Sequence, residues 1–177
     1  MSVLITIGLV LAGSIALFLI VALLTKKEFR LEKQIVINKP KQEAFDYVKL
    51  IRNQEQYSVW VMKDPNIKIV YTGTDGTVGF ISSWESKDKN VGIGAQEIIK
   101  IKEGESVDVE IRFKKPFEGT NWATTTVTAI NGSQTSVSNV FTGKSKFPMN
   151  IMNLFMEKLV GKDMQQNLVN MKQQLEK

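Results

Sequence analysis

The stretch "VDVEIRFK", residues 107–114, indicates the fold class because its apolar and charged residues alternate without interruption. Val107, Val109, Ile111 and Phe113 leave one side of the chain, and the four charged residues between them leave the other. Successive side chains of a strand point to opposite faces of a sheet. The pattern therefore predicts a strand in an antiparallel sheet with one buried and one wet face.

Segments of similar character lie on both sides of this strand and are separated by short turn sequences. Together they predict about seven antiparallel strands. Two short helices are expected after the first strand, in "KPKQEAFDYVKL" and "NQEQYSVWV". The other predicted strands cover residues 29–38, 67–73, 77–86, 91–102, 121–130 and 135–143.

The glycine-rich stretch "YTGTDGTVGF", residues 71–80, has two interpretations. A phosphate-binding loop needs a helix after its glycines, so that the amides of the helix N-terminus face the anion. A strand pattern follows here instead, and the lysine-serine pair of a Walker motif is missing. The sequence therefore predicts a hairpin, with Asp75-Gly76 in a type I′ turn.

The C-terminal segment changes to helical periodicity after Pro148. Its apolar residues, five methionines among them, form one stripe over about 28 residues, which predicts one long amphipathic helix with Gly161 in its middle. Laying this helix across the concave face of one curved sheet buries both apolar surfaces. The predicted class is α+β, with the two short helices covering the opening between sheet and helix.

The N-terminal run of residues 2–25 contains no charged residue. As a helix it would span about 36 Å, enough for a hydrocarbon core of about 30 Å. A cleaved signal peptide is the alternative, but no basic residue precedes the run and no clear small-residue cleavage site follows it. Basic residues flank one end only, which predicts a single-pass anchor with the following domain on the cytoplasmic side; they are Lys26, Lys27, Arg30 and Lys33.

The composition excludes several kinds of chemistry. The chain has neither cysteine nor histidine, so it cannot form disulfides, thiolate nucleophiles or the usual zinc sites and catalytic triads. We expect no metal and no cofactor. The net charge of +5 is spread among acidic residues rather than gathered in a stripe, so nucleic acid is not an expected partner.

Several strings in the soluble part carry a family resemblance: "VIN-P---AFDYV" at 36–48, "WVMKDPNIKIVYTGTDGTVG" at 60–79, and "FTGKSKFPMNIM" at 141–152. With the order of elements, they resemble the START-related SRPBCC superfamily of helix-grip domains, of the polyketide cyclase/dehydrase and lipid transport type. The chain is most similar to bacterial members with one N-terminal membrane span. The expected parts are an anchor at 1–25, a basic juxtamembrane linker at 26–30 and the START-like domain at 31–177.

The resemblance implies a cavity between the sheet and the C-terminal helix that takes a hydrophobic small molecule or lipid. We expect a volume of a few hundred Å³ and little polar content. The oligomeric state is left open. The predicted lining residues are Trp60, Tyr71, Phe80, Trp84, Val109, Ile111, Trp122, Met152, Phe155, Met156 and Leu159, with Phe147 a further candidate.

Two other functions follow from branches of the same superfamily. A cyclase-like enzyme would need a carboxylate inside the cavity, for which Glu85 and Glu97 are the candidates. A protein-binding module of the co-chaperone type would have a filled core and no cavity. Non-catalytic ligand binding is the function we expect.

Overall fold

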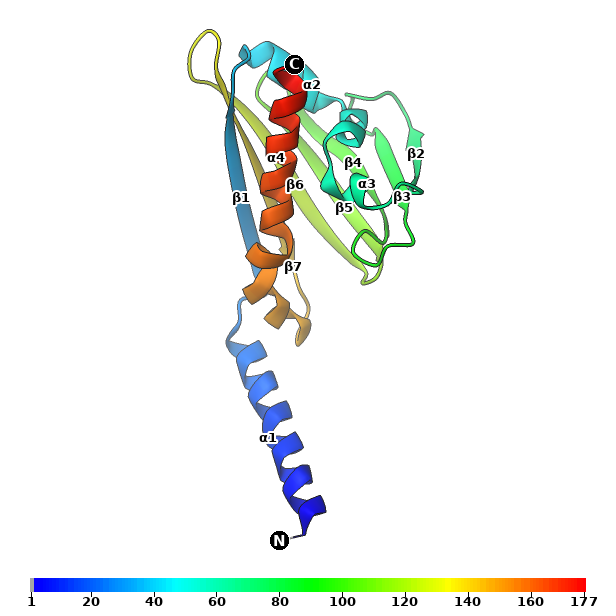
Figure 1. Ribbon diagram of the computed structural model, residues 1–177, viewed down its shortest axis with the longest axis vertical. Coiled ribbons are helices and arrows are strands. Elements are labelled where there is room, and N and C mark those ends of the chain that lie inside the picture. Colours follow the sequence, from blue (N-terminus) through cyan, green and yellow to red (C-terminus); the bar gives the residue numbers. More distant parts are fainter. Residues whose placement is uncertain (1) are drawn as a thin grey trace.

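The computed structural model describes residues 2–177 and has the predicted α+β architecture, with a seven-stranded antiparallel sheet, a C-terminal helix and an apolar N-terminal helix (Figure 1). The elements are α1 Val3–Leu24, β1 Glu28–Ile37, α2 Lys41–Lys49, η1 Ile51–Gln56, α3 Val59–Lys63, β2 Lys68–Thr72, β3 Ile81–Glu85, β4 Ile93–Lys102, β5 Ser106–Lys115, β6 Gly119–Ala129, β7 Thr135–Lys144, η2 Met149–Phe155, η3 Glu157–Gly161 and α4 Lys162–Leu175. The first of the two predicted short helices is α2, and the second is divided into the 3₁₀ stretch η1 and the helix α3.

The strands lie in the order β1-β7-β6-β5-β4-β3-β2. Every neighbouring pair is antiparallel, and the first strand pairs with the last over its whole length, from Glu28 opposite Lys144 to Ile37 opposite Thr135. The sheet curves around α4, with α2 and α3 beside it (Figure 1). The interior of the domain is therefore enclosed by the sheet on one side and by the helices on the other.

The packed core fills the end of the grip that lies away from α1. Phe45 of α2, Ile98 of β4 and Val137 of β7 are completely buried there, with Leu168 and Met171 of α4 packed against them. Figure 1 shows α2 closing this end, while α1 leaves from the opposite end. The completely buried side chains are thus concentrated at this end, and Leu168 and Met171 also line the cavity described below.

The C-terminal segment is not the single regular helix that its periodicity predicts. A 3₁₀ stretch, η2, and a π-helical turn, η3, precede the regular helix α4. The stripe is buried only along α4, whereas Met149, Met152, Phe155 and Leu159 are exposed. The exposed apolar side chains of η2 and η3 therefore make few of the tertiary contacts that stabilise a regular helix.

The stretch 73–80 joins β2 and β3 as a hairpin, as predicted, but the turn type is different. Gly76 has φ +76°, whereas Asp75 does not have positive φ, so the turn is not type I′. The side chain of Asp75 instead accepts hydrogen bonds from the backbone N–H groups of Ile51, at 2.9 Å, and Arg52, at 3.1 Å. The prediction failed because Asp75 caps η1, a partner distant in sequence.

Two asparagines attach the domain to the end of α1. The last carbonyls of a helix lack partners within the helix. The Nδ2 group of Asn150 donates to the carbonyls of Ala22, at 2.6 Å, and Thr25, at 2.8 Å. Asn153 donates in the same way to the carbonyls of Lys26 and Lys27, each at 3.0 Å. The stretch between α1 and β1 is therefore held by the domain.

The linker between α1 and the domain is shorter than the one expected at residues 26–30. β1 begins at Glu28, and residues 28–30 pair with the end of β7. Only Thr25, Lys26 and Lys27 lie between α1 and β1. The alternation that marks the strand therefore starts three residues before the domain boundary expected from the sequence.

Candidate functional site

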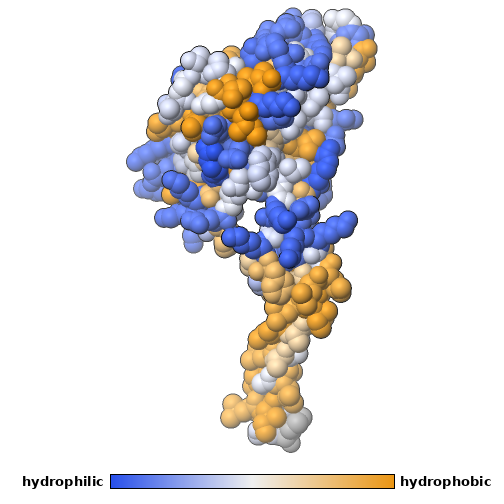
Figure 2. Space-filling view, turned by 180° about the vertical axis from the view of Figure 1, so that it is seen from behind, coloured by the Kyte–Doolittle hydropathy of each residue, from blue (hydrophilic) through white to orange (hydrophobic). Residues whose placement is uncertain are grey.

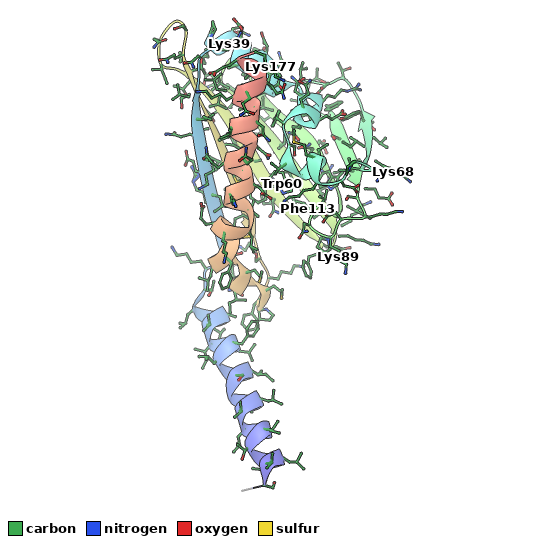
Figure 3. The ribbon with its side chains drawn as sticks, in the orientation of Figure 1. Lys39, Trp60, Lys68, Lys89, Phe113 and Lys177 are labelled. Carbon is green, nitrogen blue, oxygen red and sulfur yellow. The ribbon has the colours of Figure 1, made fainter. Side chains whose placement is uncertain are left out.

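A cavity of about 450 Å³ lies between the concave face of the sheet and the helices α3 and α4. The sequence predicts a cavity in this position and of this order of size. Val109 and Ile111 of β5 form part of its floor, and Trp60 of α3 and Met164 of α4 form part of its roof. Figure 3 shows Trp60 and Phe113 in this region, between α4 and the sheet.

Six of the predicted lining residues line this cavity: Trp60, Tyr71, Trp84, Val109, Ile111 and Met156. The strand residues among them share the inward-facing alternation of β2, β3 and β5. The side chains of Trp84 and Phe113 stack edge to face with ring centroids 5.7 Å apart, which fixes both rings in the wall.

The other five predicted residues do not line it. Phe80 lies in the packed core and is 1% exposed. Trp122 has the parity of the outer face of β6 and is 41% exposed. Met152, Phe155 and Leu159 are exposed on η2 and η3, as is the further candidate Phe147 just before them. The register of β6 and the irregular start of the C-terminal segment account for these differences.

The cavity wall is more polar than expected. Gln54 of η1 and Gln96 of β4 face one another, and Nε2 of Gln96 donates to Oε1 of Gln54 at 2.7 Å. On the other side, Nδ2 of Asn139 donates to the Thr125 hydroxyl at 2.9 Å. Pairs of neutral hydrogen-bonding groups thus lie opposite one another across an apolar space.

Alternation along β6 and β7 could have identified part of this polar wall. Asn121, Ala123 and Thr125 occupy every second position of β6, and Asn139 has inward parity on β7. The predicted set contained only hydrophobic and aromatic residues, so these positions were missed. The residues contributed by η1 carry no comparable pattern.

A tyrosine and a glutamate meet at the edge of the cavity. The Tyr71 hydroxyl donates to Oε1 of Glu55, and the Arg52 guanidinium lies 4.4 Å from the centre of the Tyr71 ring. Burial raises the pKa of Tyr71, and the hydrogen bond to Glu55 raises it further. Burial also raises the pKa of Tyr57, another lining residue. Both phenols are therefore neutral near pH 7.

The two carboxylates considered for catalysis lie outside the cavity. Glu97 accepts a hydrogen bond from Nη2 of Arg112 at 2.8 Å, and Glu110 accepts one from Nη1 of the same residue at 2.7 Å. Glu85 is exposed at the end of β3. Among the cavity's lining residues the acidic side chain is Glu55. Within residues 2–177 no group of three or more acidic residues has the geometry of a metal site.

Comparisons with solved structures agree on the fold. Norcoclaurine synthase from Thalictrum flavum, in complex with dopamine and hydroxybenzaldehyde, is 8% identical, with a TM-score of 0.65 over 86% of this chain and 88% of that one. The Zhui aromatase/cyclase from Streptomyces sp. R1128 is 9% identical, with a TM-score of 0.63 over 84% and 94%. The structure of Ara h 8.0201 is 15% identical, with a TM-score of 0.57 over 84% and 97%.

Fold and cavity together define a helix-grip domain. The model of the family described as polyketide cyclase / dehydrase and lipid transport matches residues 28–176. The chain belongs to this family. No curated protein matches it in sequence.

Proposed function

We propose that this protein is a membrane-anchored receptor or carrier that binds a hydrophobic small molecule or lipid and does not change it chemically. The observation that carries the proposal is the cavity of about 450 Å³, with mostly apolar walls, between sheet and helices. This volume is in the usual range of small-molecule sites, about 300–1,000 Å³. Burying a ligand's apolar surface would supply most of the affinity, at about 25 cal/mol per Å² before ordering costs.

The polar groups of the wall restrict the ligand further. The amides of Gln54, Gln96 and Asn139 and the phenols of Tyr57 and Tyr71 are uncharged, and they can both donate and accept hydrogen bonds. A mostly apolar molecule with one or two hydroxyl, carbonyl or protonated carboxyl groups would satisfy them. The family's description as a lipid transport family supports the same class.

Non-catalytic binding is favoured over the two alternatives by particular residues. The carboxylates on which the enzyme hypothesis depended, Glu85 and Glu97, have their side chains away from the cavity. A protein-binding module with a filled core fits poorly with a cavity of this size. The acidic side chain that does line the cavity, Glu55, is hydrogen-bonded to Tyr71.

We also propose that α1 is an uncleaved membrane anchor with the domain on the cytoplasmic side. The helix is long and apolar enough to span a membrane. Asn150 is completely buried and binds the carbonyl of Ala22, so the domain uses the end of α1 as part of its own structure. Removal of α1 as a signal peptide would take away one of the two carbonyls that this asparagine binds. Lys26 and Lys27 directly follow the span, which supports the cytoplasmic side.

A bulky side chain inside the cavity should abolish ligand binding while the fold persists. Ala123 lines the cavity from the middle of β6, so Ala123→Phe should fill part of it. We expect affinity for a long-chain fatty acid to fall at least about tenfold, equal to about 1.4 kcal/mol. Native mass spectrometry of the full chain, extracted in detergent and titrated with the fatty acid, measures the bound fraction.

The neighbouring residue provides the control. Thr124 points to the outer face of the sheet, so Thr124→Phe adds the same ring outside the cavity and should leave binding unchanged. Equal affinity in the two variants would contradict the proposed site. The same spectra of untreated protein would show as added mass any ligand that is extracted with it.

A further inference from the structure

The face of the domain next to α1 exposes large apolar side chains. The connection between β5 and β6 contains Phe117, which is 73% exposed, and η2 and η3 carry Leu154, Phe155 and Leu159, each more than half exposed. These segments lie at the end of the domain from which α1 leaves (Figure 1). We call this surface, formed by residues 114–118 and 146–159 with the end of α1, the anchor-side face.

Lysines border the apolar side chains of this face. No ion pair within the part of the chain that the structure describes involves Lys26, Lys27, Lys115, Lys146 or Lys158. Figure 2 shows the hydrophobic surface of α1 ending at a band of hydrophilic residues on the domain. Exposed apolar groups surrounded by lysines are the composition that binds the surface of an anionic bilayer.

The cavity reaches the surface at the same face. Pro116 and Phe117 line it and are exposed, as are Asn90 between β3 and β4 and Glu55 of η1, whereas its other lining residues are buried or half-buried. A second hollow, of about 580 Å³, lies between Leu24 of α1 and Leu154 of η2. Met156 lines both spaces, so this flexible side chain lies between the cavity and the hollow at the end of the anchor.

The attachment to α1 fixes where this face points. The carbonyls of Ala22 and Thr25 are bound by Asn150, and those of Lys26 and Lys27 by Asn153. The domain therefore cannot turn about a flexible linker. Since α1 leaves through the anchor-side face, a membrane that contains α1 must lie against this face.

We propose that the anchor-side face docks on the bilayer that α1 spans, with its lysines on anionic headgroups and Phe117 at the level of the acyl-chain boundary. The inference rests on the proposed function of α1 as an anchor. The cavity then opens toward lipid where Pro116 and Phe117 line it. Its ligand is an amphiphile resident in the membrane, which enters and leaves without crossing the aqueous phase.

The absence of cysteine from the chain permits a direct test with single labels. Phe117→Cys carries an environment-sensitive fluorophore on the anchor-side face, and Ile130→Cys carries it at an exposed site in the turn after β6, at the opposite end. The full chain is reconstituted in nanodiscs that contain anionic lipid and a doxyl-labelled lipid as quencher. We expect blue-shifted emission and strong quenching at position 117, and neither at position 130.

The charge requirement is tested in the same system. Lys115→Glu with Lys146→Glu, two exposed substitutions, should reduce the quenching at position 117 at least about twofold, as should replacing the anionic lipid by a zwitterionic one. Equal, water-like emission at positions 117 and 130 would overturn the docking. The outcome of the fatty-acid titration of Ala123→Phe would not affect this result, because quenching by the labelled lipid reports on position and not on occupancy.

Discussion

Replacing Gly92 by alanine should lower the free energy of unfolding by about 3 kcal/mol or more. A Cβ atom at this position would lie 2.1 Å from the carbonyl oxygen of Lys115 and 2.8 Å from its carbonyl carbon. Both are backbone atoms of the neighbouring strand, so no side-chain rotation relieves the clash. Gly92 also has φ +67°, a conformation that alanine adopts only with strain. For a chain of this length we expect a fall in melting temperature of about 6–12 °C.

The variant Gly104→Ala is a control that separates the steric clash of a Cβ atom from the strain of positive φ. It has φ +68°, almost the same as Gly92, but a Cβ atom there would meet nothing within 4 Å. We expect Gly104→Ala to cost only about 1 kcal/mol. Thermal unfolding of the full chain in detergent, followed by circular dichroism, compares the two variants. If the two variants lost the same free energy of unfolding, the close approach of Gly92 to Lys115 would not be the cause of the destabilisation.

The second large effect concerns the attachment of the domain to α1. The double substitution Asn150→Leu with Asn153→Ala removes four hydrogen bonds to the carbonyls that follow or end the helix. At about 1 kcal/mol each, the attachment loses about 4 kcal/mol. The Oδ1 atom of Asn150 has no partner in residues 2–177, so leucine also removes an unsatisfied group and the loss will be somewhat smaller. We expect the domain to turn relative to α1 while its own fold persists.

Spin labels measure this loss of orientation. One introduced cysteine replaces Ser14 in α1 and another replaces Ile130, and both sites are exposed. The parent protein in nanodiscs should give one narrow distance distribution, and the double variant a broad one. Asn131→Ala is the control, because Asn131 lies in an exposed turn and bonds only to Gln134 and Ser133. An unchanged distribution in the double variant would show that the asparagines do not hold the domain.

The hydrophobic pattern was sufficient to predict the elements and their arrangement. Alternation in "VDVEIRFK" identified a half-buried strand, and the uncharged run of residues 2–25 identified α1. Both signals are local, because the periodicity of a strand or helix is present in a few consecutive residues. The same alternation placed Val109 and Ile111 on the side that faces the cavity.

Three features depended on contacts between segments far apart in the chain. Asp75 caps η1 instead of taking part in a type I′ turn, and the irregular η2 and η3 replace half of the predicted helix. Phe80 belongs to the packed core, although its sequence context resembles that of Trp84 in the cavity wall. No local sequence pattern distinguishes a residue that packs in the core from a residue that lines the cavity.

The sequence by itself determined the class of fold, the apolar N-terminal helix and the absence of cysteine and histidine chemistry. Only the tertiary structure decided where the cavity lies, which polar side chains line it and how Asn150 joins the domain to α1. The physical reason is the range of the interactions. Burial periodicity is encoded within a few consecutive residues, whereas a cavity and a capped helix end are made by residues more than 100 positions apart, as Ala22 and Asn150 are.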